Sequence, residues 1–223
     1  LLSKYSGQED IVIGTPIAGR PHGDLQDIMG MFVNTLALRN KPEANKKYIG
    51  FLKEVKENSL EAYENQSYQL EALVEKLDIR RDTSRNPLFD VMFNMVDMVS
   101  DVDIELNDMS LIPYGGESNV AKFDLTLSSM EQNDEIAINI GYCSKLFNKN
   151  SIERLGRYYL TILEIITTNN EVKLGEIELL SDEEKNKLLN EFNDTNIDYP
   201  KNKTIQELFE SQVEKTPDNI AVV

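Results

Sequence analysis

Few residues in this chain belong to types that carry out catalysis. The 223 residues include one histidine, His22, and one cysteine, Cys143. A catalytic Ser-His-Asp triad that uses His22 remains possible, but a catalytic site that needs two histidines is excluded. A lone cysteine excludes an internal disulfide or a thiol cluster for zinc or iron–sulfur, which fits a reducing, cytoplasmic setting. Because His22 lies between Pro21 and Gly23, a loop histidine is a simpler interpretation than a general base or a metal ligand.

The glycines between Gly14 and Gly19 follow an apolar run, Ile11 to Ile13, that predicts a buried strand. Two glycines and two prolines over Gly14 to Pro21 predict a non-helical loop. A phosphate-binding loop would also need a Lys-Ser or Lys-Thr pair, which is absent here. Phosphate binding is therefore strongly disfavoured as the interpretation of this segment.

Three polar residues stand in settings that could serve a site. Asn34 lies inside Met31 to Leu38, which is apolar on both faces and predicts an interior strand. Its amide needs partners, because burial without them costs about 1–3 kcal/mol; a satisfied structural amide and an active-site donor both stay open. Arg20 is either an exposed side chain or the anchor of a buried carboxylate. Asp124 lies on the opposite face from Phe123 and Leu125, where exposure at an edge is the simpler reading.

A further polar cluster lies between Arg81 and Leu88. Its members that offer donors or acceptors are Arg81, Asp82, Ser84, Arg85 and Asn86. Aspartate favours an Asx-type turn, and the asparagine before Pro87 is held extended. Forked arginine donors suit carboxylates or carbonyls. A rigid turn with structural ion pairs is favoured over a ligand site.

Alternating helices and strands must position these residues. Helical spacing covers Tyr48 to Ala62 and Leu70 to Leu77, and alternation predicts strands over Leu88–Met98, Lys122–Met130 and Glu135–Tyr142. The last two predict a hairpin around Gln132 to Asp134. A further helix is expected with Asn150 as its cap, and capping boxes at Ser181 and Thr204 begin two more. The fold class is therefore α/β, with a mixed sheet flanked by helices.

Charge and size exclude several classes of function. The formal net charge of −16 disfavours nucleic acid and anionic membrane surfaces as partners. The longest uncharged run, Ile28 to Leu38, is too short to span a bilayer. Asn193 to Lys203 reads as an interdomain linker. Leu1 to Tyr5 reads as the last turn of a helix and the C-terminus as the start of a strand, so we expect a fragment of a longer protein.

Several segments together resemble the condensation domain of nonribosomal peptide synthetases. Residues 29–39, MGMFVNTLALR, are similar to that family's (I/V)GxFVNT(Q/L)(C/A)xR motif, and residues 81–88 match RDxSRNPL. Residues 65–71 are a weaker match to (H/N)QDYPFE, differing at Ser67, Gln69 and Leu70. Gly14 to Arg20 and Ala121 to Leu127 are also similar. The resemblance spans residues 1 to about 180, and residues 199–222 resemble the linker and start of an adenylation domain.

This resemblance implies the second, chloramphenicol-acetyltransferase-like half of the domain. Residues 1–180 would be that subdomain, 181–203 a helix and linker, and 204–223 the start of an adenylation domain. The family's catalytic HHxxxDG motif belongs to the first half, so no catalytic residue is expected here. Asn34, Gly30 and Phe32 would line the active-site channel, and Arg20 would pair with the motif's aspartate. Arg81, Asp82, Ser84, Arg85, Asn86 and Asp124 would hold structure near it.

The implied reaction joins a donor acyl or peptidyl thioester to an acceptor aminoacyl thioester as an amide. Both substrates would be attached as thioesters to the phosphopantetheine arms of carrier domains, so no cofactor and no metal would bind this chain directly. The partners would be the carrier domains, the upstream half and the adenylation domain. Two alternatives stay open: an epimerisation domain of the same fold, and a noncatalytic platform on which a carrier domain docks.

Overall fold

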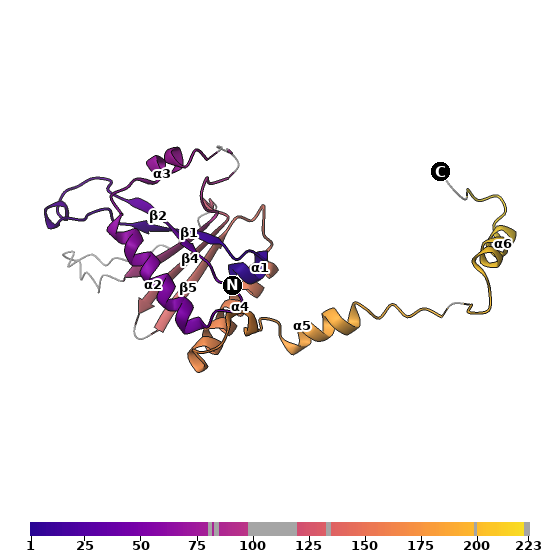
Figure 1. Cartoon of the computed structure of the whole chain (residues 1–223). Helices are drawn as coiled ribbons and strands as arrows, with labels where there is room; N and C mark the ends of the chain where they lie inside the picture. Colours follow the sequence, from indigo (N-terminus) through magenta and orange to yellow (C-terminus); the bar gives the residue numbers. More distant parts are fainter. Residues whose placement is uncertain (80–81, 83–84, 98–119, 133–134, 199, 221–223) are drawn as a thin grey trace, which may run out of the picture. The chain divides into compact units, whose positions relative to one another are not determined.

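The computed structural model of the chain describes residues 1–79, 82, 85–97, 120–132, 135–198 and 200–220. Figure 1 shows its elements in chain order. The chain divides into two compact units, Leu1–Leu179 and Leu180–Val223. Each is described by itself below.

The first unit is built on a five-stranded sheet in the order β2-β1-β3-β4-β5. Its strands are β1 (Ile11–Ile17), β2 (Asn34–Asn40), β3 (Val91–Asp97), β4 (Leu125–Gln132) and β5 (Glu135–Tyr142). β1 pairs antiparallel with β2, β3 parallel with β4, and β4 antiparallel with β5. The predicted mixed sheet and its β4–β5 hairpin are confirmed.

The join between β1 and β3 differs from the other pairings. These parallel strands share one residue pair, Gly14 opposite Met92. By contrast, β1 pairs with β2, and β3 with β4, along the full length of the strands. Pro16, two residues beyond that pair, has no N–H to donate to a ladder. The sheet therefore consists of a β2–β1 block and a β3–β4–β5 block that meet at Gly14.

The described residues of this unit form the α-helices α1 (Leu2–Ser6), α2 (Tyr48–Glu64), α3 (Leu70–Lys76) and α4 (Lys149–Thr168). α2 and α4 lie along the same face of the sheet (Figure 1). A cleft of about 440 Å³ there is lined by side chains of both helices and of the strands, among them Val55, Phe93 and Leu155. Ile152, Leu155 and Tyr158 are the buried residues of α4. The apolar layer between helices and sheet holds this unit together.

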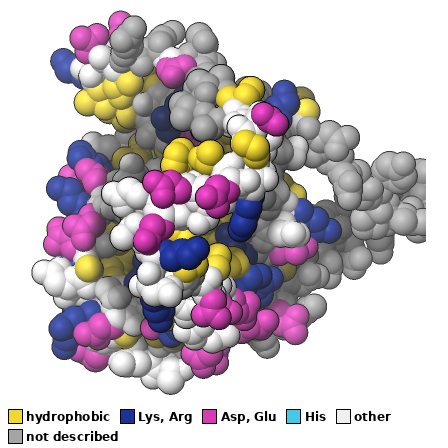
Figure 2. All heavy atoms as spheres, turned by 90° about the vertical axis from the view of Figure 1, so that its right-hand side faces the viewer, with side chains coloured by type: hydrophobic (Ala, Val, Ile, Leu, Met, Phe, Trp, Pro, Cys, Tyr) yellow, Lys and Arg dark blue, Asp and Glu magenta, His cyan; other side chains and the backbone are white. Residues whose placement is uncertain are grey.

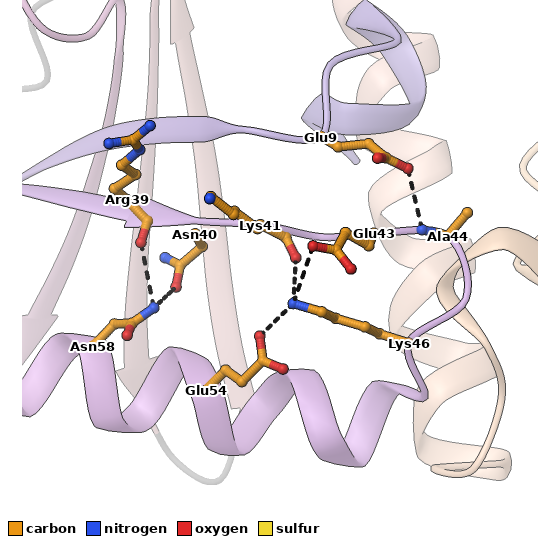
Figure 3. A network of polar contacts seen from close by, with 9 residues as sticks. All are labelled: Glu9, Arg39, Asn40, Lys41, Glu43, Ala44, Lys46, Glu54 and Asn58. Carbon is orange, nitrogen blue, oxygen red and sulfur yellow. Dashed lines mark hydrogen bonds and ion pairs between the residues drawn. The ribbon is translucent and has the colours of Figure 1, made fainter.

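A polar network fixes α2 to the edge strand β2 (Figure 3). Lys46 Nζ lies 2.7 Å from a Glu54 carboxylate oxygen and 3.0 Å from the Lys41 carbonyl oxygen. Further along, Asn58 Nδ2 donates to Asn40 Oδ1 over 3.0 Å. These contacts join the C-terminal end of β2 and the residue after it to α2 and the segment before it, so the position of α2 is set by polar as well as apolar groups.

Three expectations about the helices and strands were wrong. Gly14 to Ile17 belongs to β1 and not to a loop, because these residues pair with β2. The segment Met31–Leu38 is not an interior strand: β2 begins at Asn34 and is an edge strand, and the side chain of Met31 is 93% exposed. The cap of α4 is Asn148, whose side chain accepts from the Ser151 N–H, whereas Asn150 lies inside the helix.

The second unit contains α5 (Asp182–Asn186), a π-helical turn η3 (Lys187–Glu191) and α6 (Ile205–Lys215). The capping boxes predicted at Ser181 and Thr204 are both present, because each side chain accepts from the third residue of its helix and that glutamate bonds back. The predicted linker lies between these helices, and its described residues, 193–198 and 200–203, are exposed.

On the face in Figure 2, acidic groups lie in several places with lysine and arginine side chains and small apolar areas between them. Among the described residues, no helix is both long and apolar enough to cross a membrane.

Candidate channel-lining site

Asn34 is the first residue of β2, and both the nitrogen and the oxygen of its amide have hydrogen-bond partners. Its Nδ2 donates to the backbone carbonyls of Gln66 over 2.9 Å and Tyr68 over 3.2 Å, and its Oδ1 accepts from the Thr35 N–H over 2.8 Å. Gln66 and Tyr68 lie in the turn between α2 and α3. Of the two readings of Asn34, the satisfied structural amide describes these contacts. A role as a donor to substrate stays a prediction.

Gln66 and Tyr68 were not predicted as site residues. They lie in the segment that matches the (H/N)QDYPFE motif weakly, but they contribute backbone carbonyls. Backbone acceptors do not depend on the side chains at Ser67, Gln69 or Leu70, so the departures from the motif leave this contact intact. The weak match of residues 65–71 to the (H/N)QDYPFE motif was the sequence feature that could have pointed to Gln66 and Tyr68.

Arg20, Gly30 and Phe32 come together in the long loop between β1 and β2. The Arg20 guanidinium donates to the carbonyls of Leu25, Gln26 and Gly30, the last two over 3.4 Å. It also lies over the ring of Phe32, 4.3 Å from the centroid, a favourable cation–π contact. The structure thus brings Arg20, Gly30 and Phe32 together. Their place in an active-site channel and the pairing of Arg20 with an upstream aspartate stay predictions.

Gly19 forms the neck of the same loop. Its φ is +65°, a left-handed conformation that glycine adopts without strain. A Cβ at this position would lie 1.7 Å from the Phe32 carbonyl oxygen and 3.6 Å from the Asn34 backbone nitrogen. The two arms of the loop therefore approach each other closely just before Asn34, which links the position of Asn34 to the shape of the loop.

The polar cluster of residues 81–86 is described in part, because Arg81 and Ser84 lie outside the described residues. The Arg85 guanidinium donates to the Asp90 carboxylate, and its backbone N–H donates to the Asp82 carbonyl over 3.2 Å. The hydrogen bond from Arg85 to Asp90 raises the pKa of Arg85, and the charges of Asp90, Asp124 and Asp82 add to the rise. Asn86 is half-buried.

Asp124 directly precedes β4, and its charge acts on Arg85. Its backbone N–H donates to the Asp90 carbonyl over 3.0 Å, and its own carbonyl accepts from the Cys143 N–H over 3.0 Å. Asp124 is half-buried, so the expectation of an exposed edge was wrong. Asp90, which sequence reasoning missed, connects the turn to both β3 and β4. The arrangement supports the structural interpretation of Arg85 and Asp124.

The remaining chemistry-bearing side chains stand apart from these groups. His22 is exposed and precedes the short 3-10 turn η1 (Gly23–Leu25), and Cys143 is half-buried after β5. Among the described residues, no three histidine, cysteine or acidic side chains form a group suited to a metal ion.

Comparison with known proteins decides the family. A profile described as "Condensation domain" matches residues 1–189. The chain belongs to the condensation domains of nonribosomal peptide synthetases. It is 52% identical over its full length to gramicidin S synthase 2 of Brevibacillus brevis and 47% identical to bacitracin synthase 3 of Bacillus licheniformis. It spans 5% and 4% of the length of these relatives.

Solved structures share the fold of this condensation-domain chain. A four-domain nonribosomal peptide synthetase bound to AMP and glycine superposes with a TM-score of 0.78 at 22% identity, over 98% of this chain and 18% of that one. The starter condensation domain of rhizomide synthetase, as a double mutant with C8-CoA, gives 0.65 at 21%, over 81% and 41%. The X-domain of teicoplanin biosynthesis in complex with OxyB gives 0.69 at 24%, over 81% and 40%. The predicted α/β fold class, chloramphenicol-acetyltransferase-like, is confirmed.

Proposed function

We propose that this chain is the second half of a condensation domain that forms an amide between two carrier-bound substrates. The observation that carries the proposal is the family match over residues 1–189, in a chain that covers about two fifths of a solved condensation-domain chain (41%). With one histidine in 223 residues, the chain cannot hold the family's HHxxxDG motif. The motif would then belong to the first half.

In the proposed reaction, the amine of the acceptor attacks the carbonyl carbon of the donor thioester. The C–N bond forms and the C–S bond breaks, and the thiol of the donor phosphopantetheine leaves with the proton that the amine gives up. The contribution of this chain is positioning, which can supply several kcal/mol when two tethered groups are held in contact. The channel wall would be formed by Gly30, Phe32 and Asn34, with Arg20 beside them.

The partners follow from this role. Phosphopantetheine belongs to the donor and acceptor carrier domains and not to this chain, and the upstream half completes the channel. Residues 181–203 would lead to an adenylation domain beginning at residue 204. This division is supported by the separate compactness of Leu180–Val223 and by the exposed segment after Asn193. A cytoplasmic location is part of the same proposal.

The test compares the chain alone with the chain joined to the upstream half of the same domain. Donor and acceptor carrier proteins are loaded with their thioesters, and amide product is measured by mass spectrometry. We expect product from the complete domain and none from the 223-residue chain. Product from the chain alone would show that the proposed division of labour is incorrect.

A second candidate function is a noncatalytic docking platform. It is favoured by the similarity to the X-domain, which was solved in complex with another protein, OxyB. The same experiment separates the candidates when carrier binding is measured alongside. A complete domain that binds a loaded carrier and yields no amide over hours would favour the platform.

A further inference from the structure

The tip of the loop between β1 and β2 carries two methionines that lie open to solvent. Met29 and Met31 are 98% and 93% exposed, the largest exposed fractions among the large apolar residues that the structure describes. Methionine more often fills irregular gaps in a core, where its flexible side chain is useful. Packing does not account for these two side chains, and both thioethers are accessible to molecules in solution.

The other described methionines lie in the sheet and are better protected. Met92 on β3 is buried, Met130 on β4 is half-buried, and Met95 near the end of β3 is 58% exposed. A thioether is converted to its sulfoxide by an oxidant that reaches the sulfur, so exposure ranks the methionines by susceptibility. Among the described methionines, Met29 and Met31 should therefore be oxidised first.

Their position in the loop gives such a modification a consequence. The two methionines flank Gly30, and Phe32 follows Met31, so both are neighbours of proposed channel residues. In the motif (I/V)GxFVNT, which this segment resembles, the first position is isoleucine or valine, whereas this chain has Met29. Isoleucine and valine have no sulfur to oxidise. Sensitivity to an oxidant at Met29 would therefore be a property of this chain and not of the motif.

Few hydrogen bonds oppose a change at the tip of this loop. Every residue of the loop is described, and its recorded backbone–backbone hydrogen bonds lie within residues 22–28, so none involves residues 29–33. The Gly30 carbonyl accepts from the Arg20 guanidinium over 3.4 Å, which is long for a hydrogen bond. A sulfoxide oxygen on either side of Gly30 is a polar acceptor that competes for this donor and attracts water. A segment with so few bonds changes conformation at a small cost in free energy.

We propose that Met29 and Met31 form an oxidation site whose modification slows condensation. Hydrogen peroxide transfers one oxygen atom to each thioether sulfur: the O–O bond breaks, an S–O bond forms, and water leaves. Each sulfur is oxidised and each peroxide is reduced, and a methionine sulfoxide reductase reverses the change at the expense of a thiol. The site itself belongs to the chain, whereas its effect on condensation rests on the proposed function.

The first experiment maps oxidation in the 223-residue chain. The folded chain is treated with hydrogen peroxide, the reaction is stopped with catalase, and peptides are analysed by mass spectrometry. Met29 and Met31 should gain one oxygen atom about tenfold faster than the buried Met92. The same treatment in urea is the control, because there all methionines should react at similar rates. Equal rates for Met29, Met31 and Met92 in the folded chain would overturn the proposal.

The second experiment measures amide formation by the complete condensation domain. The domain is treated with peroxide, and the peroxide is removed before loaded carriers are added. The test variant carries both Met29→Ile and Met31→Leu; neither position has a positive φ, so these side chains fit the backbone. Met95→Leu is the matched control, since it removes an exposed methionine outside the loop. Each rate is compared with that of the same variant before treatment.

Peroxide should lower the rate of the wild type and of Met95→Leu about tenfold, and the double variant should keep its rate. Methionine sulfoxide reductase with its thiol should restore the wild type, and the thiol alone should not. An equal loss in the double variant, full recovery with the thiol alone, or a complete domain whose Met29 and Met31 stay unoxidised would each overturn the proposal. Absence of amide from the untreated wild type would count against the proposed function alone, because the oxidation map does not depend on turnover.

Discussion

Replacing Asn34 with leucine tests how much of this residue's role is structural. The substitution removes the two hydrogen bonds that hold the Gln66 and Tyr68 carbonyls and the one that receives the Thr35 N–H. Leucine has a similar volume, so the change is one of bonding more than of packing. β2 then loses its polar link to the turn between α2 and α3.

The expected cost can be worked out from these contacts. A hydrogen bond contributes about 0.5–1.5 kcal/mol net, so three would contribute about 1.5–4.5 kcal/mol. Asn34 is half-buried and water can reach the freed carbonyls, so we expect the lower part of that range, about 2 kcal/mol. For a chain of this size that lowers the melting temperature of the first unit by about 4–8 °C.

Asn58 provides a matched control. Its amide also connects two elements, donating to Asn40 Oδ1 over 3.0 Å and to the Arg39 carbonyl over 3.4 Å (Figure 3). It lies on α2, away from the loop that carries Gly30 and Phe32. Thermal unfolding of both leucine variants is followed by circular dichroism, and condensation is assayed in the complete domain well below either melting temperature.

We expect both variants to be destabilised, and Asn34→Leu alone to lose condensation, by about 100-fold, the scale of loss that a misplacement of about 1 Å produces. An Asn34→Leu domain that is folded and retains the wild-type rate would remove Asn34 from the channel. A melting temperature equal to wild type would refute the structural reasoning.

Three further predictions address other parts of the chain. Gly14→Ala should destabilise the first unit by about 1–3 kcal/mol, since its Cβ would lie 2.2 Å from the buried Phe89 ring; urea unfolding measures this, and an equal cost in a Phe89→Leu background would contradict the steric explanation. Limited proteolysis should cut first within residues 193–203, and resistance there would mean that the segment is protected. The Thr204 backbone N–H and hydroxyl hold the pKa of Glu207 below its usual range, so the first turn of α6 is stabilised at neutral pH and loses that support as pH falls through the lowered pKa. NMR titration should give a higher pKa for Glu207 in Thr204→Ala, and an unchanged pKa would disprove the capping contribution.

Local signals predicted the elements well where neighbours in sequence decide the structure. The capping boxes at Ser181 and Thr204 bond to residues three positions away, so their types and spacing were sufficient. The α4 cap was misplaced by two residues because Asn148 and Asn150 are both good caps, and only the geometry selects Asn148.

Contacts between distant residues could not be predicted. Asn34 finds its acceptors 32 and 34 residues away, and a hydrophobic pattern does not encode a backbone carbonyl. Gly14 to Ile17 looked like a loop because of its glycine and proline, yet the partner β2 makes it a strand and the Phe89 ring explains the glycine. The family motif drew attention to Asn34, Gly30 and Phe32, but it carries no information on the carbonyls of their loop that Arg20 contacts.

The narrow join between the two blocks of the sheet has a consequence for folding. β4 and β5 are neighbours in sequence, so their pairing closes a short loop. Gly14 and Met92 are separated in the chain by β2, α2 and α3, so their pairing closes a much longer one. We expect β1 and β3 to pair at Gly14 late in folding, after the rate-limiting step. Substitutions at the β1–β3 pairing would then raise the unfolding rate and leave the folding rate almost unchanged. The unfolding rate of this unit would therefore be sensitive to the place where its strands share the fewest pairs.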